Sequence, residues 1–233
     1  MTGARVEPDP ARVRRRLLRW FSRNARRFFW REGLGGEPLT TFQALLVEFL
    51  LWKTSARAEA TIHAIVLRYR SPADVVSRSL TELEDELRPL GLHRRRSRCL
   101  LSFSQQILDR HAGRTPTDVT SLQALTGIGQ YAARATACVL AGSELMPVDA
   151  NTARIFGRLH GIDPPSVRQP DAAWDARLSA FVPRRDPRRF LWATMDLAAS
   201  TCTAREPRCA SCPLVGDCAT GAVRSPERHV RMR

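Results

Sequence analysis

The chain has 233 residues, 43% of them hydrophobic, and a formal net charge of +14. This length and apolar content indicate a folded globular protein and exclude a disordered one. The large positive excess favours a polyanionic partner, with DNA or RNA as the first candidate, over a merely solvated basic surface.

Apolar periodicity is helical nearly throughout, so the sequence predicts an all-α fold of about nine or ten helices. The first predicted helix spans 10–30 and carries many arginines. Further helical segments are predicted over 40–54, 55–70, 79–91, 92–113, 119–125, 130–142, 171–182 and 188–200. Two more begin after Ser71–Pro72 and after Asp149. The basic tail from Arg224 onward is expected to fray.

No signal sequence is recognisable at the N-terminus. The most apolar run, 42–52, is too short to cross a bilayer and contains Glu48. We therefore expect no membrane partner and a cytoplasmic, nucleoid-associated protein of bacterial or archaeal type. In a reducing compartment, six cysteines favour metal ligation or free thiols over disulfides.

The stretch "LTGIGQY", residues 125–131, joins two predicted helices and contains two glycines, Gly127 and Gly129. Glycine can adopt positive φ and leaves the backbone N–H groups uncovered. Beside a helix N-terminus such groups favour an anion, and a DNA phosphate fits without any base being read. The alternative is a plain connector between helices.

Four cysteines follow the spacing C-x6-C-x2-C-x5-C, at Cys202, Cys209, Cys212 and Cys218. Four thiolates this close repel one another unless a metal centre neutralises them. A single C-x-x-C flanked by lone cysteines suits a compact iron–sulfur cluster better than a zinc ribbon. A zinc loop remains the alternative. Cys99 and Cys138 lie in apolar helical patterns and are interpreted as small buried hydrophobes.

Taken in order, the "LTGIGQY" hairpin, the "VDAN" motif at 148–151 and the cysteine loop resemble one family. It is the iron–sulfur branch of the helix-hairpin-helix DNA glycosylases (HhH-GPD, endonuclease III superfamily), and in particular its thymine/uracil mismatch and MutY-type adenine glycosylases. The resemblance covers about residues 25–220 and implies two all-α lobes. One is a six-helix domain with the hairpin, at 37–147. The other combines 1–36 with 148–233 and holds a [4Fe–4S] cluster in the loop 202–218.

The resemblance makes Asp149 the catalytic acid. Breaking an N-glycosidic bond builds positive charge on the sugar, which a carboxylate stabilises. Taken alone, Asp149 is more typical of a helix N-cap. Tyr131 stands where lyase branches carry the attacking lysine, which implies a monofunctional glycosylase. The resemblance makes Tyr131 a catalytic-site residue that lines the pocket and contacts the sugar or the base. Lys53, the sole lysine, is the alternative nucleophile and otherwise a DNA contact.

Other site residues are also implied by the resemblance. Glu48 matches a glutamate that contacts the extruded base, and its apolar helix predicts a raised pKa suited to an acid. Trp52 matches the side chain that fills the gap left by the flipped base, and core packing is the alternative role. The remaining expected DNA contacts are Gln130, Asn151, Arg205 and Arg208.

The expected substrate is double-stranded DNA containing a mismatched or damaged base, bound by a monomer. Thymine or uracil opposite guanine is favoured, because the chain stops shortly after Cys218 where MutY-type enzymes usually carry a further domain. A MutY-type adenine glycosylase and a catalytically inactive iron–sulfur DNA-binding redox sensor are the alternatives. Thr126, where proline is usual, and "LLWKTSA" at 50–56 depart from the family pattern.

Overall fold

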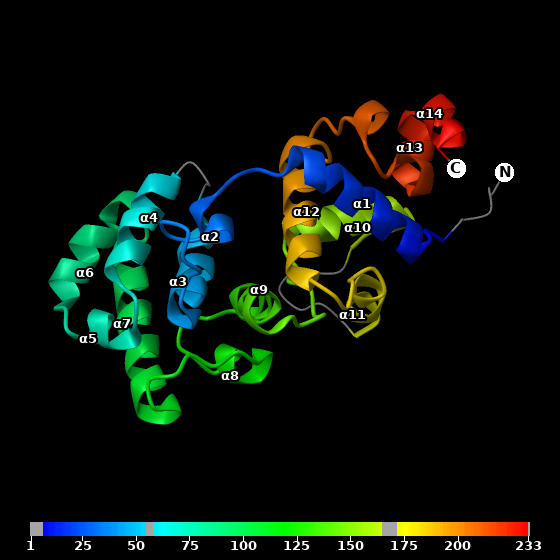
Figure 1. Cartoon of the computed structure of the whole chain (residues 1–233). Coiled ribbons are helices and arrows are strands. Elements are labelled where there is room, and N and C mark those ends of the chain that lie inside the picture. Colours follow the sequence, from blue (N-terminus) through cyan, green and yellow to red (C-terminus); the bar gives the residue numbers. More distant parts are fainter. Residues whose placement is uncertain (1–6, 55–57, 165–171, 233) are drawn as a thin grey trace. The chain divides into compact units, whose positions relative to one another are not determined.

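The computed structural model describes residues 7–54, 58–164 and 172–232, and the chain forms two compact units (Figure 1). One unit is Arg27–Ala141, and the other combines the residues up to Arg26 with those from Gly142 onward. The predicted divisions were at 36/37 and 147/148. Residues 55–57 and 171, which begin two of the predicted helices, lie outside the described ranges.

The fold is all-α, as predicted, since residues 7–54, 58–164 and 172–232 contain helices and no β-strand. In the Arg27–Ala141 unit the helices are α2 (Phe29–Glu32), α3 (Thr41–Leu51), α4 (Glu59–Arg68), α5 (Pro72–Val76), α6 (Leu80–Leu87), α7 (His93–His111), α8 (Val119–Gln123) and α9 (Gln130–Ala141). In the other unit they are α1 (Pro10–Asn24), α10 (Ala150–His160), α11 (Ala172–Ser179), α12 (Pro187–Ser200), α13 (Ala219–Arg224) and α14 (Pro226–Arg231). These described ranges thus hold fourteen α-helices rather than nine or ten, because the short helices α2, α13 and α14 lie where no separate helix was predicted. None of the described helices is long and apolar enough to span a membrane.

Helix α3 forms the centre of the Arg27–Ala141 unit, with nearly every residue from Phe42 to Leu50 buried. Its start is fixed by a capping box between Thr40 and Gln43. The buried Gln43 amide also donates to the Val66 carbonyl of α4 at 2.8 Å. Burial on all sides explains why the sequence of this helix lacks a polar face.

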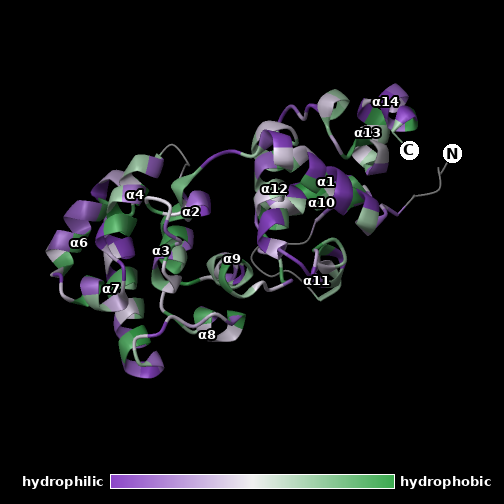
Figure 2. Ribbon diagram, in the orientation of Figure 1, coloured by the Kyte–Doolittle hydropathy of each residue, from purple (hydrophilic) through white to green (hydrophobic). Residues whose placement is uncertain are grey.

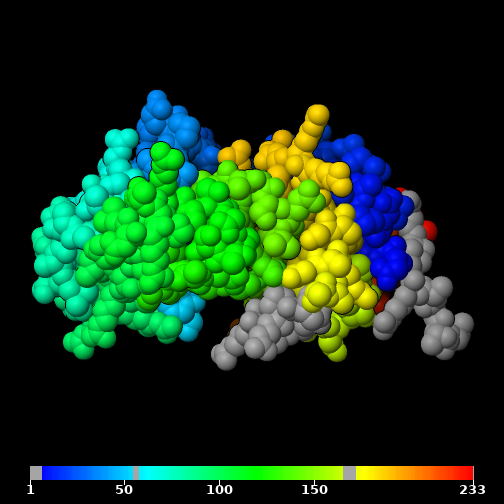
Figure 3. All heavy atoms as spheres, turned by 90° about the horizontal axis from the view of Figure 1, so that it is seen from below, coloured from blue at the N-terminus to red at the C-terminus, as the bar shows by residue number. Residues whose placement is uncertain are grey.

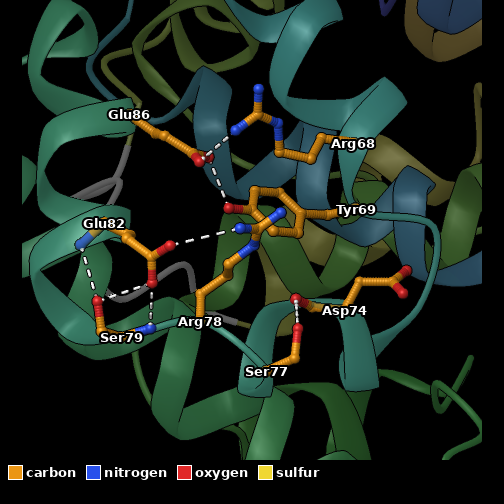
Figure 4. Close-up of polar contacts among 8 residues, drawn as sticks. All are labelled: Arg68, Tyr69, Asp74, Ser77, Arg78, Ser79, Glu82 and Glu86. Carbon is orange, nitrogen blue, oxygen red and sulfur yellow. Dashed lines mark hydrogen bonds and ion pairs between the residues drawn. The ribbon is translucent and has the colours of Figure 1, made fainter.

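Helices α4 and α6 are joined by a polar cluster around the end of α4 (Figure 4). Both the Tyr69 hydroxyl and the Arg68 guanidinium donate to the Glu86 carboxylate of α6, at 2.5 Å each. Ser71 caps α5 with Pro72 at the first helical position, as predicted. The contacts to Glu86 hold α6 against the end of α4.

Helix α1 ends at Asn24, so the single helix predicted over 10–30 is wrong. The buried Asp196 carboxylate of α12 accepts from both the backbone N–H and the Nε of Arg26, at 2.9 and 2.7 Å. This long-range contact holds the chain in an extended conformation after Ala25, which local periodicity cannot reveal. Figure 2 shows the alternating arginines and apolar residues of α1 in purple and green.

The C-terminal tail is docked rather than frayed. Helix α14 buries His229, whose Nδ1 lies 2.7 Å from the Val215 carbonyl oxygen, and Arg16 of α1 donates to the Met232 carbonyl. Along α1, Arg14 donates to the carbonyls of Ala180 and Phe181. Figure 3 shows dark blue atoms of the N-terminal segment beside yellow atoms of the segment that follows residue 171. Helices α1 and α14 are therefore held in the same unit.

Candidate functional site

The glycine hairpin joins α8 to α9, and its two glycines have different surroundings. Gly127 has φ +81°, and a Cβ there would lie 2.7 Å from Cys99 Sγ. Gly129 is not in the positive-φ region, and a Cβ there would meet no atom within 4 Å. The hairpin is therefore held against α7 at Gly127 and left uncovered at Gly129, where a phosphate could approach.

A pocket of about 410 Å³ adjoins this hairpin within the Arg27–Ala141 unit. Such a volume is in the range of small-ligand pockets. Four of the predicted site residues line it together: Trp52, Gly127, Gly129 and Tyr131. Glu48, Lys53 and Gln130 belong to the same unit but are not among its lining residues. The Gln130 Nε2 is buried and makes no hydrogen bond with the described protein atoms.

Three cations surround the Trp52 ring. Lys53 Nζ lies 5.4 Å from the ring centroid, and the guanidinium carbons of Arg95 and Arg96 lie at 5.1 and 5.8 Å. These are cation–π distances. Lys53 is exposed and has φ +51°, the left-handed region that non-glycine residues rarely adopt. A positively charged frame around an aromatic ring suits a nucleic-acid surface.

Arg96 and Leu92 were missed by the sequence analysis. Arg96 is 1% exposed, and Leu92, with φ +52°, is 48% exposed at the start of α7. Among many arginines nothing singles out Arg96 by type. Its helical phase could have done so, because Arg96, Leu100 and Phe103 fall on one buried face of α7.

Glu48 is buried in α3, at 8% exposure. Burial disfavours the charged form and raises the pKa of its carboxyl to about 7, although Arg31 lowers it in part. A carboxyl that holds its proton near neutral pH can act as a general acid.

Asp149 is the N-cap of α10, in the unit that contains the cysteine loop. Its Oδ1 accepts from the backbone N–H groups of Asn151 and Thr152 at 2.9 and 2.8 Å, and Oδ2 accepts from Asn151 Nδ2 at 2.9 Å. The capping role expected of an isolated aspartate is therefore present. It fixes the orientation of a half-buried carboxylate at the positive end of a helix dipole.

A hydrogen-bonded series runs from Asp149 to the cysteine loop. Arg154 Nη2 donates to Asn151 Oδ1 at 3.0 Å, and its Nε donates to the Cys202 carbonyl at 2.9 Å. One turn later, Arg158 donates to the carbonyls of Thr203 and Ala204 at 2.7 and 2.8 Å. Helix α10 thus carries the candidate acid at its start and holds the loop with two arginines further along.

The four loop cysteines line one largely apolar cavity, together with residues such as Leu159, Leu197 and Leu214. Burial raises the pKa of Cys212 to about 12 and that of Cys218 to about 11, and the neighbouring cysteines add to both effects. A positively charged metal centre would reverse this preference for neutral thiols. Within the described ranges, no three or more His, Cys, Asp or Glu residues are arranged to hold a single metal ion. The convergence of all four cysteines on one cavity fits a larger cluster.

Arg205 and Arg208 are exposed on this loop. Arg208 also lines the cysteine cavity. Their guanidinium groups are open to solvent, as a phosphate contact requires.

Comparison with known proteins identifies the class to which these features belong. The family described as "HhH-GPD superfamily base excision DNA repair protein" matches residues 51–175, more than half of the chain. The chain therefore belongs to the HhH-GPD superfamily.

Individual relatives and structures refine the comparison. The thymine-DNA glycosylase of Aeropyrum pernix is 32% identical over 212 residues, covering 88% of this chain and 92% of the relative. The adenine DNA glycosylase of Mycobacterium tuberculosis is 34% identical over 204 residues, covering 85% of this chain and 64% of the relative. A solved thermostable thymine-DNA glycosylase has the same fold, with a TM-score of 0.82 at 23% identity over 92% of this chain and 97% of that one.

Proposed function

We propose that this DNA glycosylase is monofunctional and hydrolyses the N-glycosidic bond of thymine or uracil opposite guanine. The observation that carries the proposal is the Asp149 carboxylate, which is oriented by three donors from Asn151 and Thr152. The relatives named for thymine and for adenine both support base release from DNA as the reaction.

In this proposal Asp149 stabilises the positive charge that develops on deoxyribose as the base departs. Its carboxylate also orients or deprotonates the attacking water. The fixed hydrogen bonds to Oδ1 and Oδ2 keep it in one orientation, so little reorganisation is needed during the reaction.

Glu48 supplies the acid. With a pKa of about 7, a substantial fraction of Glu48 is protonated at neutral pH, and this fraction can donate a proton to the departing base. Protonation makes the base a better leaving group, and the apolar surroundings of Glu48 in α3 support this role.

Tyr131 supports hydrolysis without strand cleavage, because a phenol cannot form the imine that a lyase needs. Lys53 is the single lysine of the chain, and its Nζ lies over the Trp52 ring. We therefore propose that water is the final acceptor. Borohydride reduction during turnover should trap no covalent adduct with DNA, and a trapped adduct would assign lyase chemistry to Lys53.

The remaining predicted contacts hold the DNA. Gly127, Gly129 and Gln130 bind a phosphate, Trp52 occupies the gap left by the flipped base, and Lys53, Asn151, Arg205 and Arg208 add further contacts. We propose that the protein acts as a monomer on chromosomal DNA in the cytoplasm.

We further propose that Cys202, Cys209, Cys212 and Cys218 hold a [4Fe–4S] cluster, to which their shared cavity is suited. When bound, such a cluster cross-links the loop through four thiolates. Iron and sulfide analysis of purified protein tests this assignment, and zinc without iron would contradict it.

The base is identified by incubating the protein with duplexes that carry each mispair or common lesion and then applying hot alkali, which breaks the strand at abasic sites. Cleavage at thymine or uracil opposite guanine is expected. The second candidate, adenine release, is favoured by the 34% identity to an adenine glycosylase, and cleavage only at adenine would establish it.

Asp149→Asn tests the catalytic assignment. Asparagine is a good N-cap, so α10 should persist. Base release should fall by at least about 100-fold, the scale for losing a transition-state electrostatic group, while DNA binding survives. Unchanged release would remove Asp149 from the mechanism.

A further inference from the structure

Two loops near the hairpin pocket each contain a non-glycine residue in the left-handed backbone region. Lys53 follows Trp52 after the end of α3, and Leu92 follows Gly91 before α7, with φ values of +51° and +52°. Such conformations cost on the order of 1–3 kcal/mol each and persist only where surrounding contacts hold them.

The Arg96 guanidinium makes contacts to both. Its Nε donates to the Gly91 carbonyl at 3.0 Å, and its Nη2 donates to the Trp52 carbonyl and to Thr54 Oγ1 at 2.6 Å each. Its Nη1 donates to the carbonyls of Phe49 and Leu50 at 3.2 and 3.3 Å, which lie at the end of α3.

These contacts equal the donor capacity of an arginine, whose guanidinium has five N–H groups. The side chain is 1% exposed, so the guanidinium cannot make a direct contact with a DNA phosphate. Burial instead lowers the pKa of Arg96. A buried charge is kept only when its hydrogen bonds are satisfied, which indicates that the local backbone is built around this group.

The two residues that Arg96 positions share a chemical character. The Trp52 ring is half-buried and surrounded by cations, and the Leu92 side chain is exposed beside the basic segment 93–95. Apolar side chains set among cations are the type that enters between DNA bases while the cations bind the phosphates.

We propose that Arg96 is a positioning residue that locks the segments 52–54 and 91–92 into one rigid element, so that Trp52 and Leu92 enter the DNA together. This inference rests on the proposed function, because it assumes a flipped base and a gap to fill. Arg96 touches neither base nor sugar and acts through the carbonyls of Gly91 and Trp52.

The test uses Arg96→Lys and Arg96→Ala in the full chain. Lysine keeps the charge but offers at most three donors from one nitrogen, so it cannot bond five acceptors. Alanine leaves a cavity that a free guanidinium ion could occupy. Gln43→Ala is the matched control, because it removes a buried polar group from α3 that contacts neither segment.

The probe is a duplex with 2-aminopurine beside a stable abasic analogue, whose fluorescence rises when neighbouring bases are unstacked. We expect Arg96→Lys and Arg96→Ala to reduce this signal, and single-turnover base release from a cleavable duplex, at least about tenfold, since small misplacements are costly. Affinity for an intact duplex should change less than about threefold, because the hairpin and surface arginines supply it.

Addition of millimolar guanidinium chloride, compared with equal sodium chloride, should restore the Arg96→Ala signal, an effect that a general loss of stability would not show. Gln43→Ala should keep the 2-aminopurine signal even where its thermal unfolding midpoint falls as far as that of the Arg96 variants. The inference would be overturned by an unchanged 2-aminopurine signal in Arg96→Lys. It would also be overturned if Gln43→Ala lost as much of this signal as the Arg96 variants. If the wild type releases no base while the signal still depends on Arg96, the proposed function fails and the inference stands.

Discussion

Asn151 Nδ2 donates a 2.9 Å hydrogen bond to Oδ2 of Asp149, the carboxylate oxygen that the backbone cap does not use. The amide oxygen of Asn151 in turn accepts from Arg154, which also binds the Cys202 carbonyl. Asn151 therefore links the candidate catalytic acid to the cysteine loop, in addition to any contact it makes with DNA.

Asn151→Ala is expected to leave α10 folded, because the cap uses backbone donors and Thr152. It should slow single-turnover base release by about 10- to 100-fold, since a loosely held catalytic group loses orientation. DNA affinity measured in parallel should fall much less. If affinity falls as far as the rate, Asn151 is chiefly a DNA contact.

Gly127 and Gly129 should respond differently to the same substitution. Gly127→Ala places a Cβ 2.7 Å from Cys99 Sγ at φ +81° and is expected to destabilise the fold by about 1–3 kcal/mol, measured by denaturant unfolding. Gly129→Ala meets no atom within 4 Å, so stability should hold while DNA affinity falls. An equal loss of stability in Gly127→Ala and Gly129→Ala would contradict the different roles assigned to the two glycines.

Local sequence signals predicted most of the longer helices and the caps at Ser71 of α5 and Asp149 of α10. They could not predict the break after Asn24, because it depends on Asp196, 170 residues from Arg26. Arg96 shows the same limit within the site. Its role depends on carbonyls at 49–52 and at Gly91, which only the packing of α3 against α7 brings together.

The docking of α1 on the cysteine loop gives a prediction for the cluster. Asp217 precedes Cys218, has a fully buried side chain, and accepts from Arg12 and Arg16 of α1. Removal of one partner from a buried ion pair costs about 3–5 kcal/mol, and the low end is expected because the arginine side chains are 31% and 23% exposed.

Asp217→Ala should therefore lower the free energy of unfolding and the amount of iron retained after purification, measured by denaturation and metal analysis. Asp163→Asn, at an exposed position of the same unit, serves as the control and should change neither quantity. Full iron content in Asp217→Ala would show that α1 does not contribute to holding the loop.

Glu48 gives a prediction for pH dependence. Its folded-state pKa of about 7 lies above the ordinary value of 4.5, so the folded protein favours the protonated form. Its contribution to stability is complete below pH 4.5 and is lost as the pH rises through 7. Each pKa unit corresponds to about 1.4 kcal/mol, so the loss amounts to about 3 kcal/mol.

Glu48→Gln removes this titration and should make the protein more stable than the wild type above pH 7, because a neutral amide replaces a buried charge. The same substitution should abolish the decline of base-release rate on the alkaline side of pH 7 and lower the rate below it. Both expectations are tested by measuring the free energy of unfolding and the single-turnover rate of base release at pH values on either side of 7. A wild-type rate that does not fall as Glu48 loses its proton would show that the carboxyl is not the acid, even if the stability profile follows the expected curve.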